Sequence, residues 1–262
     1  MTEVVLSAQF AAPIVDIAAL AAFTIAVGKR APTITHQPVL PRMEETFDAP
    51  VFAPAFQIVE QMASLPRTWF IGTDNYLIQL QPDRLTLNWR REAPDTSYPG
   101  YAAIRDRFDG HLADLRAAIE GTGRELPPID ICEVAYVNPV EVPGEPEPFR
   151  HPDLARLINR LCPAPDESFL GQAEDAQYQA RWRIPHPDGS GQPVGRLYLA
   201  ASPHLVGGAQ QPLYLVNLTA HVLPPKDSTV DALNIAHEYV VLGFKDLTTQ
   251  EMHEYWRLKE IS

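Results

Sequence analysis

The chain is poor in lysine and cysteine, and it carries a large excess of acidic over basic groups. Lysines account for only four of its 21 basic residues, and with abundant alanine, proline and arginine this composition is typical of a high-GC bacterial source. The formal charge is −12. Sequence-independent binding to nucleic acid and binding to an anionic membrane both need a basic surface. The negative charge therefore argues against nucleic acid and membrane as partners.

Long hydrophobic runs are also scarce. The longest covers residues 10–27, contains Pro13 and Asp16, and has no Lys or Arg before it. It fits neither a membrane-spanning helix nor a signal peptide, so it predicts a buried helix in a cytoplasmic protein without a membrane partner. The two cysteines, Cys132 and Cys162, are interpreted as packed thiols of a reducing cytoplasm, and a bridge between them stays open.

Motifs of common enzyme classes are absent from the sequence. His237 begins "HEYVV", which has Val241 where a zinc-protease helix needs its second histidine. The stretch "GSGQPVG" from Gly189 has the wrong spacing for a dinucleotide loop and predicts a turn between strands. His221 and His237 could meet in the fold, but satisfied structural histidines are the commoner case. We therefore expect no catalytic residue, no metal and no cofactor, and a protein that acts without catalysis.

The length of the chain and the order of its predicted strands and helices restrict the possible folds. At 262 residues, 45% of them hydrophobic, the chain is long enough for one large domain or two small ones. The halves 1–128 and 129–262 each show a strand, a helix, several strands and a long helix. Two interpretations stay open, a duplicated β-α-β(n)-α unit or one continuous domain. Both predict an α+β fold, a largely antiparallel sheet with long helices packed on one face.

Apolar periodicity and turn residues place the elements of both halves. A proline-rich passage, 31–54, is expected to be an extended, largely irregular connector, and its acid pair Glu44–Glu45 is expected to be solvated charge. A linker is expected at 142–149. The expected strands lie at 2–10, within 67–91, and at 129–140, 173–184, 196–201 and 213–223. The expected helices begin at Asp16, Tyr101, His151, Ser228 and Thr248, the last with a capping box of Thr248 and Glu251.

The stretch "QLQPDRLTLNWRR", residues 79–91, is the densest in polar groups and predicts a β-hairpin. A tight turn at Pro82–Asp83 places Tyr76 opposite Trp89 on an apolar face and sorts the polar residues to the other face. Proline favours type I or II turns, whereas two-residue hairpins prefer the primed types, so a register shifted by one residue is the alternative.

Polar residues of similar kinds occupy one face of the hairpin and of two strands in the second half. Two interpretations stay open, a solvated sheet face or a surface that binds a ligand or a partner. Arginine is enriched at interfaces and lysine depleted, which agrees with the second. The candidate binding residues are Gln79, Arg84, Asn88, Arg90, Arg181, Arg183, Asn217 and His221.

Charged residues near the hairpin turn also allow two roles. Asp83 and the hairpin arginines could position an anionic group. Alternatively, Asp83 only caps the turn, and Arg84 and Arg90 pair with local acids such as Glu92 or Asp95. Exposed charges near turns more often have this second, structural role.

Several segments together resemble a known family. The motif QxQPDRLxxNWR at 79–90, the "YPGY" before the long helix and the "YVNPV" of the second half resemble a sporadically distributed bacterial family of uncharacterised proteins. The ends "EVVLSAQF" and "HEYVVLGFKDLTTQEMHEYW" look like that family's ends, so the resemblance covers the whole chain. It implies no activity, cofactor or catalytic residue. Its patchy distribution is similar to that of horizontally moved genes, which implies a role in bacterial defence or toxin–antitoxin islands.

Two functions from different classes fit these observations. The first, which we favour, is a non-catalytic intracellular binding or regulatory protein whose partner is another protein, with homodimerisation as a further option. The alternative is a small-ligand-binding or hydrolytic protein with a pocket between the sheet and the helices. A pocket needs a deep concavity with converging polar groups, whereas a partner-binding protein needs a large exposed patch.

Overall fold

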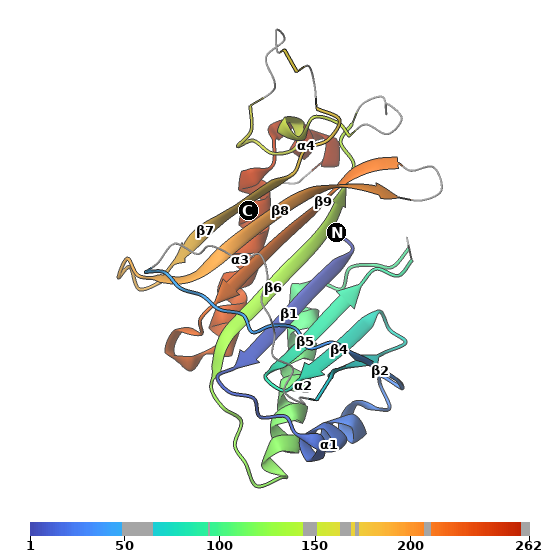
Figure 1. The fold of residues 1–262 in the computed structure, drawn as a ribbon, viewed down its shortest axis with the longest axis vertical. Helices are drawn as coiled ribbons and strands as arrows, with labels where there is room; N and C mark the ends of the chain where they lie inside the picture. The colour runs from blue at the N-terminus through green and yellow to red at the C-terminus, as the bar shows by residue number, and fades with distance from the viewer. Residues whose placement is uncertain are drawn as a thin grey trace.

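The computed structural model describes residues 1–48, 65–93, 95–143, 151–162, 169–170, 173–206 and 211–257. These residues form an α+β fold built on one continuous sheet of nine strands, in the order β2-β3-β4-β5-β1-β6-β9-β8-β7. Every neighbouring pair of strands is antiparallel. The long helices α2 and α3 lie on one side of this sheet, as expected from the sequence (Figure 1).

The elements follow a similar order in the two halves of the chain. The first half contains β1 (Glu3–Phe10), α1 (Ile17–Val27), β2 (Thr33–Gln37), β3 (Arg67–Ile71), β4 (Tyr76–Gln81), β5 (Arg84–Arg90) and α2 (Tyr101–Glu120). The second half contains β6 (Ile129–Val140), η1 (Leu154–Arg156), β7 (Tyr178–Pro185), β8 (Pro193–Val206), β9 (Gln211–Val222), η2 (Pro225–Asp227), α3 (Thr229–Leu247) and α4 (Gln250–Trp256).

β1 and β6 form the centre of the sheet, where the two halves meet. β1 pairs with β5 on one side and with β6 on the other. Outward from this centre the first half continues with β4, β3 and β2, and the second half with β9, β8 and β7. The boundary expected between residues 128 and 129 lies directly before β6. The sheet therefore crosses this boundary without interruption.

Local chemistry explains where α1 lies and how it packs. Its N-cap is Asp16, as expected, whose carboxylate accepts the N–H of Ala19 at 2.9 Å. The alanine-rich helix packs on α2 and places Phe23 edge-on against Phe70 of β3, with ring centroids 5.6 Å apart. Both rings are fully buried, so this contact fixes α1 over the outer strands of the first half.

The helix-covered face of the sheet carries a row of apolar residues, each opposite the next across the strands. This apolar row consists of Ile34, Phe70, Ile78, Leu87, Leu6, Val134, Ala220, Leu197 and Trp182. Its members from Phe70 to Leu197 are at most 4% exposed. Each large residue of the row contributes on the order of 2 kcal/mol through burial, so the row forms the centre of the hydrophobic core. Trp182, at one end, is only partly buried.

The hairpin of β4 and β5 has the register expected from its sequence, with Tyr76 opposite Trp89. Trp89 is 2% exposed, so its position in the core is confirmed. Neither Pro82 nor Asp83 has a positive φ, so the turn is not of a primed type. The carbonyl oxygens of both residues accept N–H groups from the end of β1 and the loop after it. These long-range bonds hold a turn that is locally less favourable.

Two local expectations are wrong, and a third is met in part. The connector expected at 31–54 contains one short strand, β2, and is otherwise irregular up to residue 48, while its residues 49–54 lie outside the described ranges. The helix expected from His151 is reduced to the single turn η1. The capping box expected at Thr248 does not form, because Thr249 is the N-cap of α4. Of the expected linker at 142–149, residues 144–149 lie outside the described ranges.

Two further findings concern the cysteines and the helices. Cys132 on β6 is buried, as expected, whereas Cys162 is exposed, and both are free thiols. None of the helices in the described ranges is long and apolar enough to cross a membrane.

Candidate functional site

A second row of residues crosses all nine strands on the face opposite the helices. Each member pairs directly with the next across neighbouring strands, so their side chains share one face. This polar row consists of Thr35, Trp69, Gln79, Thr86, Ser7, Glu133, His221, Arg196 and Arg183. We call the side of the sheet that carries it the polar face.

The structure brings all eight candidate binding residues together on the polar face. They occupy four successive rows, in the order Arg84; Gln79, His221 and Arg183; Asn88 and Arg181; Arg90 and Asn217. Strand periodicity alone therefore placed these side chains on one face of the sheet. What it did not reveal is that a segment of the same chain lies on the surface.

This segment, residues 38–48, crosses the polar face from β4 toward β7, and we call it the strap (Figure 1). Two glutamines of the sheet bind its main chain in pairs of hydrogen bonds. The amide of Gln81 accepts from the N–H of Leu40 at 3.1 Å and donates to its carbonyl at 3.2 Å. The amide of Gln9 does the same for Met43, at 2.7 and 2.9 Å. Such paired bonds recognise an extended main chain whatever its side chains are.

Three arginines of the sheet donate to further carbonyl oxygens along the strap. The acceptor of Arg84 is Pro41, at 2.7 Å, and that of Arg183 is Phe47, at 2.8 Å. The guanidinium of Arg196 donates to Thr46 at 2.9 Å and lies over the ring of Phe47, 5.1 Å from its centroid. The strap is thus held along its length by side chains from five different strands, β4, β5, β1, β8 and β7.

Strap residue Glu45 is buried in a carboxylate-binding pocket of the second half. Its side chain is 1% exposed and pairs with the guanidinium of Arg196. The hydroxyl of Tyr198 donates to it, and the Nδ1 of His221 lies 2.9 Å from its Oε1. On the far side of the imidazole, the Nε2 of His221 lies 3.0 Å from the carboxylate of Glu133. Two carboxylates and two cationic side chains therefore neutralise one another within the pocket.

The surroundings of His221 decide its protonation. Burial alone would lower its pKa, but the hydrogen bonds and charges of Glu133 and Glu45 outweigh burial and raise the pKa to about 9. The pKa of Glu133 is lowered, although burial alone would raise it. The hydrogen bond and the charge of His221, together with the charge of Arg84, outweigh the effect of burial. His221 is therefore an imidazolium at neutral pH, with both N–H groups donated to carboxylates.

Arg42 of the strap forms a second ionic contact in the first half. Its guanidinium bonds Asp83 at 2.9 Å and Asp130 at 2.6 Å. Asp83 is 5% exposed and also accepts from Gln81 at 2.7 Å. The expectation that Asp83 only caps the hairpin turn is therefore wrong, because its carboxylate takes part in holding the strap.

The remaining candidates of the first half form a cluster around Glu3, the first residue of β1. Its carboxylate accepts from Asn88 at 2.7 Å and from Arg90 at 2.8 Å. Asn88 in turn accepts from Gln79 at 2.6 Å, and the guanidinium of Arg90 lies 5.5 Å from the centroid of Trp69. The partner of Arg90 is thus Glu3, and that of Arg84 lies in the strap, not the local acids Glu92 and Asp95.

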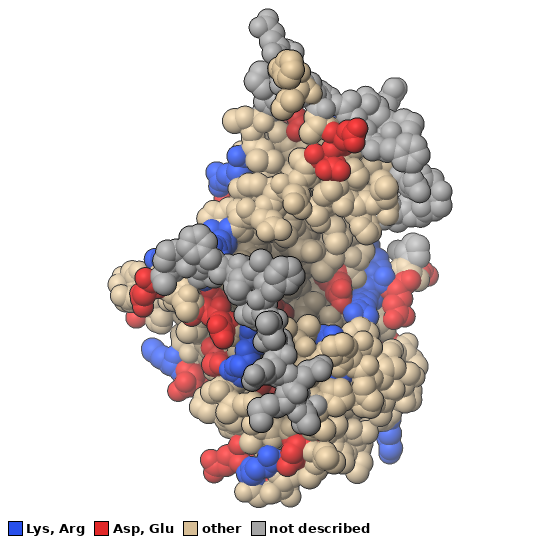
Figure 2. Space-filling model, viewed as in Figure 1, with Lys and Arg blue, Asp and Glu red and all other residues tan. Residues whose placement is uncertain are grey.

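Acidic and basic side chains lie next to one another at several places on the polar face, among mostly uncharged residues (Figure 2). The molecule as a whole is strongly acidic, yet here charges of both signs are arranged in contact. Such local complementarity is what distinguishes a contact surface from a uniformly charged one.

Sequence reasoning missed the most important residue of this site. Glu45 was expected to be solvated charge, and this is wrong because its side chain occupies the buried pocket. Its partners Arg196 and Tyr198 were also missed, although both lie on the same face of β8. One signal was available: the polar faces of the hairpin and of β7 carry two arginines each but almost no acids, so counter-charges had to come from other parts of the chain.

His221 and His237, which could have met in the fold, lie on opposite sides of the sheet. His221 is on the polar face, whereas His237 of α3 lies on the helix side, stacked on Tyr101 at 3.7 Å and bonded to the hydroxyl of Tyr136 at 3.1 Å. They do not meet. Among the residues that the structure describes, no group of three or more His, Cys, Asp or Glu side chains could hold a metal ion.

No protein-family model, no curated protein and no solved structure matches this chain. The family resemblance of the motif at 79–90 therefore stays a prediction. The polar face, its strap and the Glu45 pocket are the observations on which a function has to be argued.

Proposed function

We propose that this protein binds another protein by holding an extended, acidic segment of it on the polar face of the sheet. In the absence of that partner, the strap occupies the same place. The protein is then a binding or regulatory component, not a catalyst. We keep within this proposal the setting that the family resemblance implies, a bacterial defence or toxin–antitoxin system.

One observation carries the proposal: the sheet recognises the strap in the way a receptor recognises a peptide. Side chains of Gln81, Gln9, Arg84, Arg196 and Arg183 bond its main chain. These contacts depend on extended geometry and not on the identity of the strap's side chains. Specificity comes from a single buried anchor, the carboxylate at position 45, in a pocket with matching donors.

The strap is also suited to being displaced. Most of its residues are exposed on their outer side, and it adds no large residue to the apolar row. It is held by hydrogen bonds and ion pairs whose partners water or another chain can also take, so that each neutral bond contributes about 0.5–1.5 kcal/mol net and each bond to a charged group about 1.5–3 kcal/mol. Its release leaves the sheet and helices packed, so it belongs to the low-stability part of the structure.

The chemistry of the pocket agrees with binding better than with catalysis. Both nitrogens of His221 are bonded to carboxylates, and its pKa of about 9 keeps it protonated. A general base at neutral pH needs a free lone pair and a pKa near 7, at which an imidazole is largely neutral. The pocket instead offers fixed donors to a carboxylate, which is the task of a recognition site.

A peptide competition experiment tests the proposal. The probe is a fluorescein-labelled peptide of residues 38–48, PVLPRMEETFD, and the hosts are the wild type, Glu45→Gln and Glu45→Ala. Both variants weaken the anchor of the host's own strap, so we expect each to bind the peptide at least about tenfold more tightly than the wild type does. Fluorescence anisotropy measures the binding.

Two controls distinguish specific recognition of the peptide from nonspecific binding. Glu44→Ala removes an exposed neighbouring acid and should behave as the wild type. A peptide with glutamine in place of Glu45 should bind at least about tenfold more weakly, since a charge-assisted bond is lost. If folded Glu45→Gln and Glu45→Ala proteins both fail to bind the peptide, the proposal is wrong. If the glutamine peptide binds as tightly as the original peptide, the carboxylate at position 45 is not what the pocket recognises.

A further inference from the structure

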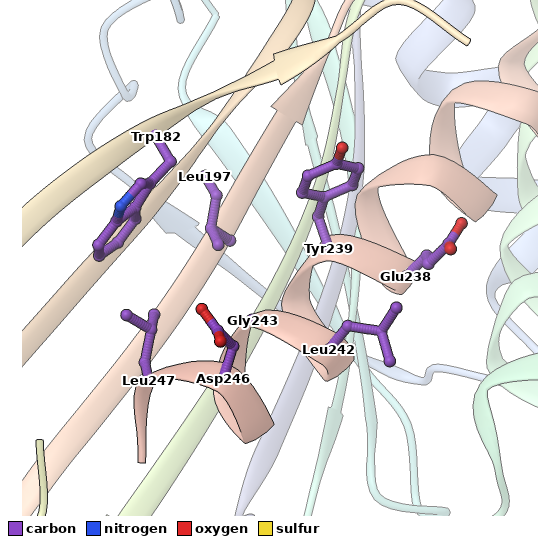
Figure 3. Close-up of a pocket in the computed structure, with 8 residues that line it drawn as sticks. All are labelled: Trp182, Leu197, Glu238, Tyr239, Leu242, Gly243, Asp246 and Leu247. Carbon is purple, nitrogen blue, oxygen red and sulfur yellow. The ribbon is translucent and has the colours of Figure 1, made fainter. Parts of the chain in front are cut away.

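On the helix side of the sheet, an open apolar groove runs between α3 and the outer strands of the second half. Its cavity has a volume of about 380 Å³. Trp182 of β7 and Leu197 of β8 form the floor, while Tyr239 and Leu242 of α3 form the wall (Figure 3). Leu242 is 49% exposed. This groove shares no residue with the polar face.

A comparison of the two ends of the apolar row shows that one end is covered by a helix and the other is not. Phe70 and Trp182 are the outer aromatic residues of this row, on the corresponding strands β3 and β7 of the two halves. Phe70 is fully buried because Phe23 of α1 packs on it, whereas Trp182 is only partly buried. Between β6 and β7, the described residues contain only the three-residue turn η1. The described part of the second half therefore has the floor for a helix such as α1 but not the helix.

Gly243 keeps this groove deep beside α3. A Cβ atom at this position would lie 2.7 Å from Cδ2 of Leu197 and 3.6 Å from Cδ2 of Leu218. The first distance is shorter than any normal contact, so the glycine lets α3 approach the sheet closely. The close approach of α3 to the sheet is thus set by Gly243 against Leu197, whereas Leu242 and Trp182 remain accessible within the groove.

The rim of the groove is acidic. A second cavity of about 450 Å³ adjoins it, shares Glu238 and extends to Asp231 and Asp188. Asp246 lies at the other end, where it pairs with Arg160 at 2.7 Å. Of the described residues that line the two cavities, only Lys226 adds a fixed positive charge. Together they follow α3 from Asp231 to Leu247, a length of about 25 Å, which accommodates a helix of about four turns.

We propose that this groove binds an amphipathic helix of a partner protein, with basic residues along its flanks. A large apolar side chain of that helix packs on Trp182 and Leu197 as Phe23 packs on Phe70. Its Lys or Arg residues lie beside Glu238 and Asp231. The mode is a helix laid into a groove, in which one face supplies regularly spaced apolar anchors and the flanks supply charge complementarity.

A stapled helical peptide based on α1 is a direct probe. It carries residues 16–28 with Ile17→Lys, Ala21→Lys and Ile25→Lys, that is DKAALKAFTKAVG, so that its Phe23 side is apolar and its other side basic. A second peptide carries glutamate at the same three positions. We expect the wild-type protein to bind the lysine peptide at least about tenfold more tightly than the glutamate peptide in fluorescence anisotropy.

Matched variants of the whole chain locate the binding. Leu242→Ser and Glu238→Lys should each weaken binding of the lysine peptide at least about fivefold. Ile25→Ser removes an apolar side chain that is 82% exposed but lies far from the groove on α1, and it should have no effect. Melting temperatures verify that each variant is folded.

Three outcomes overturn the proposal. The first is no binding of the lysine peptide by the wild type up to millimolar concentration. The second is an equal loss of binding in Ile25→Ser and Leu242→Ser. The third is a wild type that sediments as a dimer while Leu242→Ser sediments as a monomer, because the occupant is then a second copy of this chain. None of these results depends on the strap or on the Glu45 pocket.

Discussion

Arg84 and Arg90 lie on the same face of β5, yet their surroundings differ. Arg84 is 7% exposed, and it donates to Pro41 of the strap and, at 2.8 Å, to the side chain of Gln9. Burial lowers its pKa, although the charges of Glu133 and Asp83 oppose this effect. The side chain of Arg90 is 39% exposed and pairs with Glu3. Arg84 thus forms buried hydrogen bonds between the sheet and the strap, whereas Arg90 forms an ion pair at the surface.

This difference predicts unequal costs of truncation. Arg84→Ala removes the donor to the carbonyl of Pro41 and to the side-chain oxygen of Gln9, and it removes a buried positive charge near Glu133 and Asp83, so we expect a loss of about 2–4 kcal/mol in the free energy of unfolding. Arg90→Ala is the matched control and should cost under about 1 kcal/mol, because exposed pairs are screened by solvent. Urea unfolding of both variants measures the two costs, and equal values would contradict this assignment.

Strand periodicity made the faces of single residues predictable. Trp89 and Gln79 were placed on the correct sides of the hairpin because side chains alternate along any strand. Glu45 was not placed, because its position depends on partners far away in the sequence. Its hydrogen bond to His221 joins residues 176 positions apart, and no local pattern encodes such a contact.

Among the elements, the strap responds most directly to pH. The folded pKa of His221 is raised from 6.5 to about 9. Its contribution to stability is therefore fully present below pH 6.5 and is lost as the pH rises through 9. Part of this contribution comes from Glu45 of the strap and part from Glu133 of the sheet. Only the Glu45 part favours the attached strap.

Amide hydrogen exchange can follow this attachment. The N–H groups of Leu40 and Met43 are bonded to side chains of the sheet, so they are protected only while the strap is attached. After correction for intrinsic exchange, their protection should fall about tenfold between pH 6.5 and pH 9. Leu6, in the central strand, is the internal control and should not change. His221→Gln should remove the pH dependence, and protection that is flat in the wild type would contradict the role of His221.

Elements with a strong internal pattern were predicted well, and those that depend on context were not. The apolar spacing of α2 and the N-cap of α1 are local properties, so the sequence revealed them. β2 was missed because it is a short edge strand within a proline-rich passage, and its assignment rests on pairing with β3. The helix expected from His151 is only a turn, because the main chain of Leu157 and Asn159 bonds Thr249 and Leu247 at the end of α3 instead of continuing a helix.

At the scale of the whole molecule, the central pair of strands joins the halves. β1 has hydrogen-bonded neighbours on both edges, one from each half. If residues 1–128 folded alone, the edge of β1 facing β6 would be unpaired, which is costly and favours aggregation. A largely antiparallel sheet with long helices on one face was predictable from the sequence, but the pairing of β1 with β6 that joins the halves within it was not, because this pairing leaves no local trace.

We expect the two halves to unfold in one transition. The tryptophans allow a separate view of each half, since Trp69 and Trp89 lie in the first and Trp182 and Trp256 in the second. A variant with Trp182→Phe and Trp256→Phe reports on the first half, and one with Trp69→Phe and Trp89→Phe on the second. Their fluorescence midpoints in urea should each coincide with the midpoint from far-UV circular dichroism of the same variant. Fluorescence and circular dichroism midpoints that differ clearly within either variant would show that the halves unfold separately.

The covalent tether of the strap sets a threshold for any competitor. The strap follows β2 directly, so its effective concentration at the polar face is on the order of millimolar, as for short flexible linkers. A free segment of equal intrinsic affinity at micromolar concentration would therefore displace it in only about one molecule in a thousand. A partner can overcome this threshold only by adding affinity elsewhere on the surface, so avidity decides which proteins gain access.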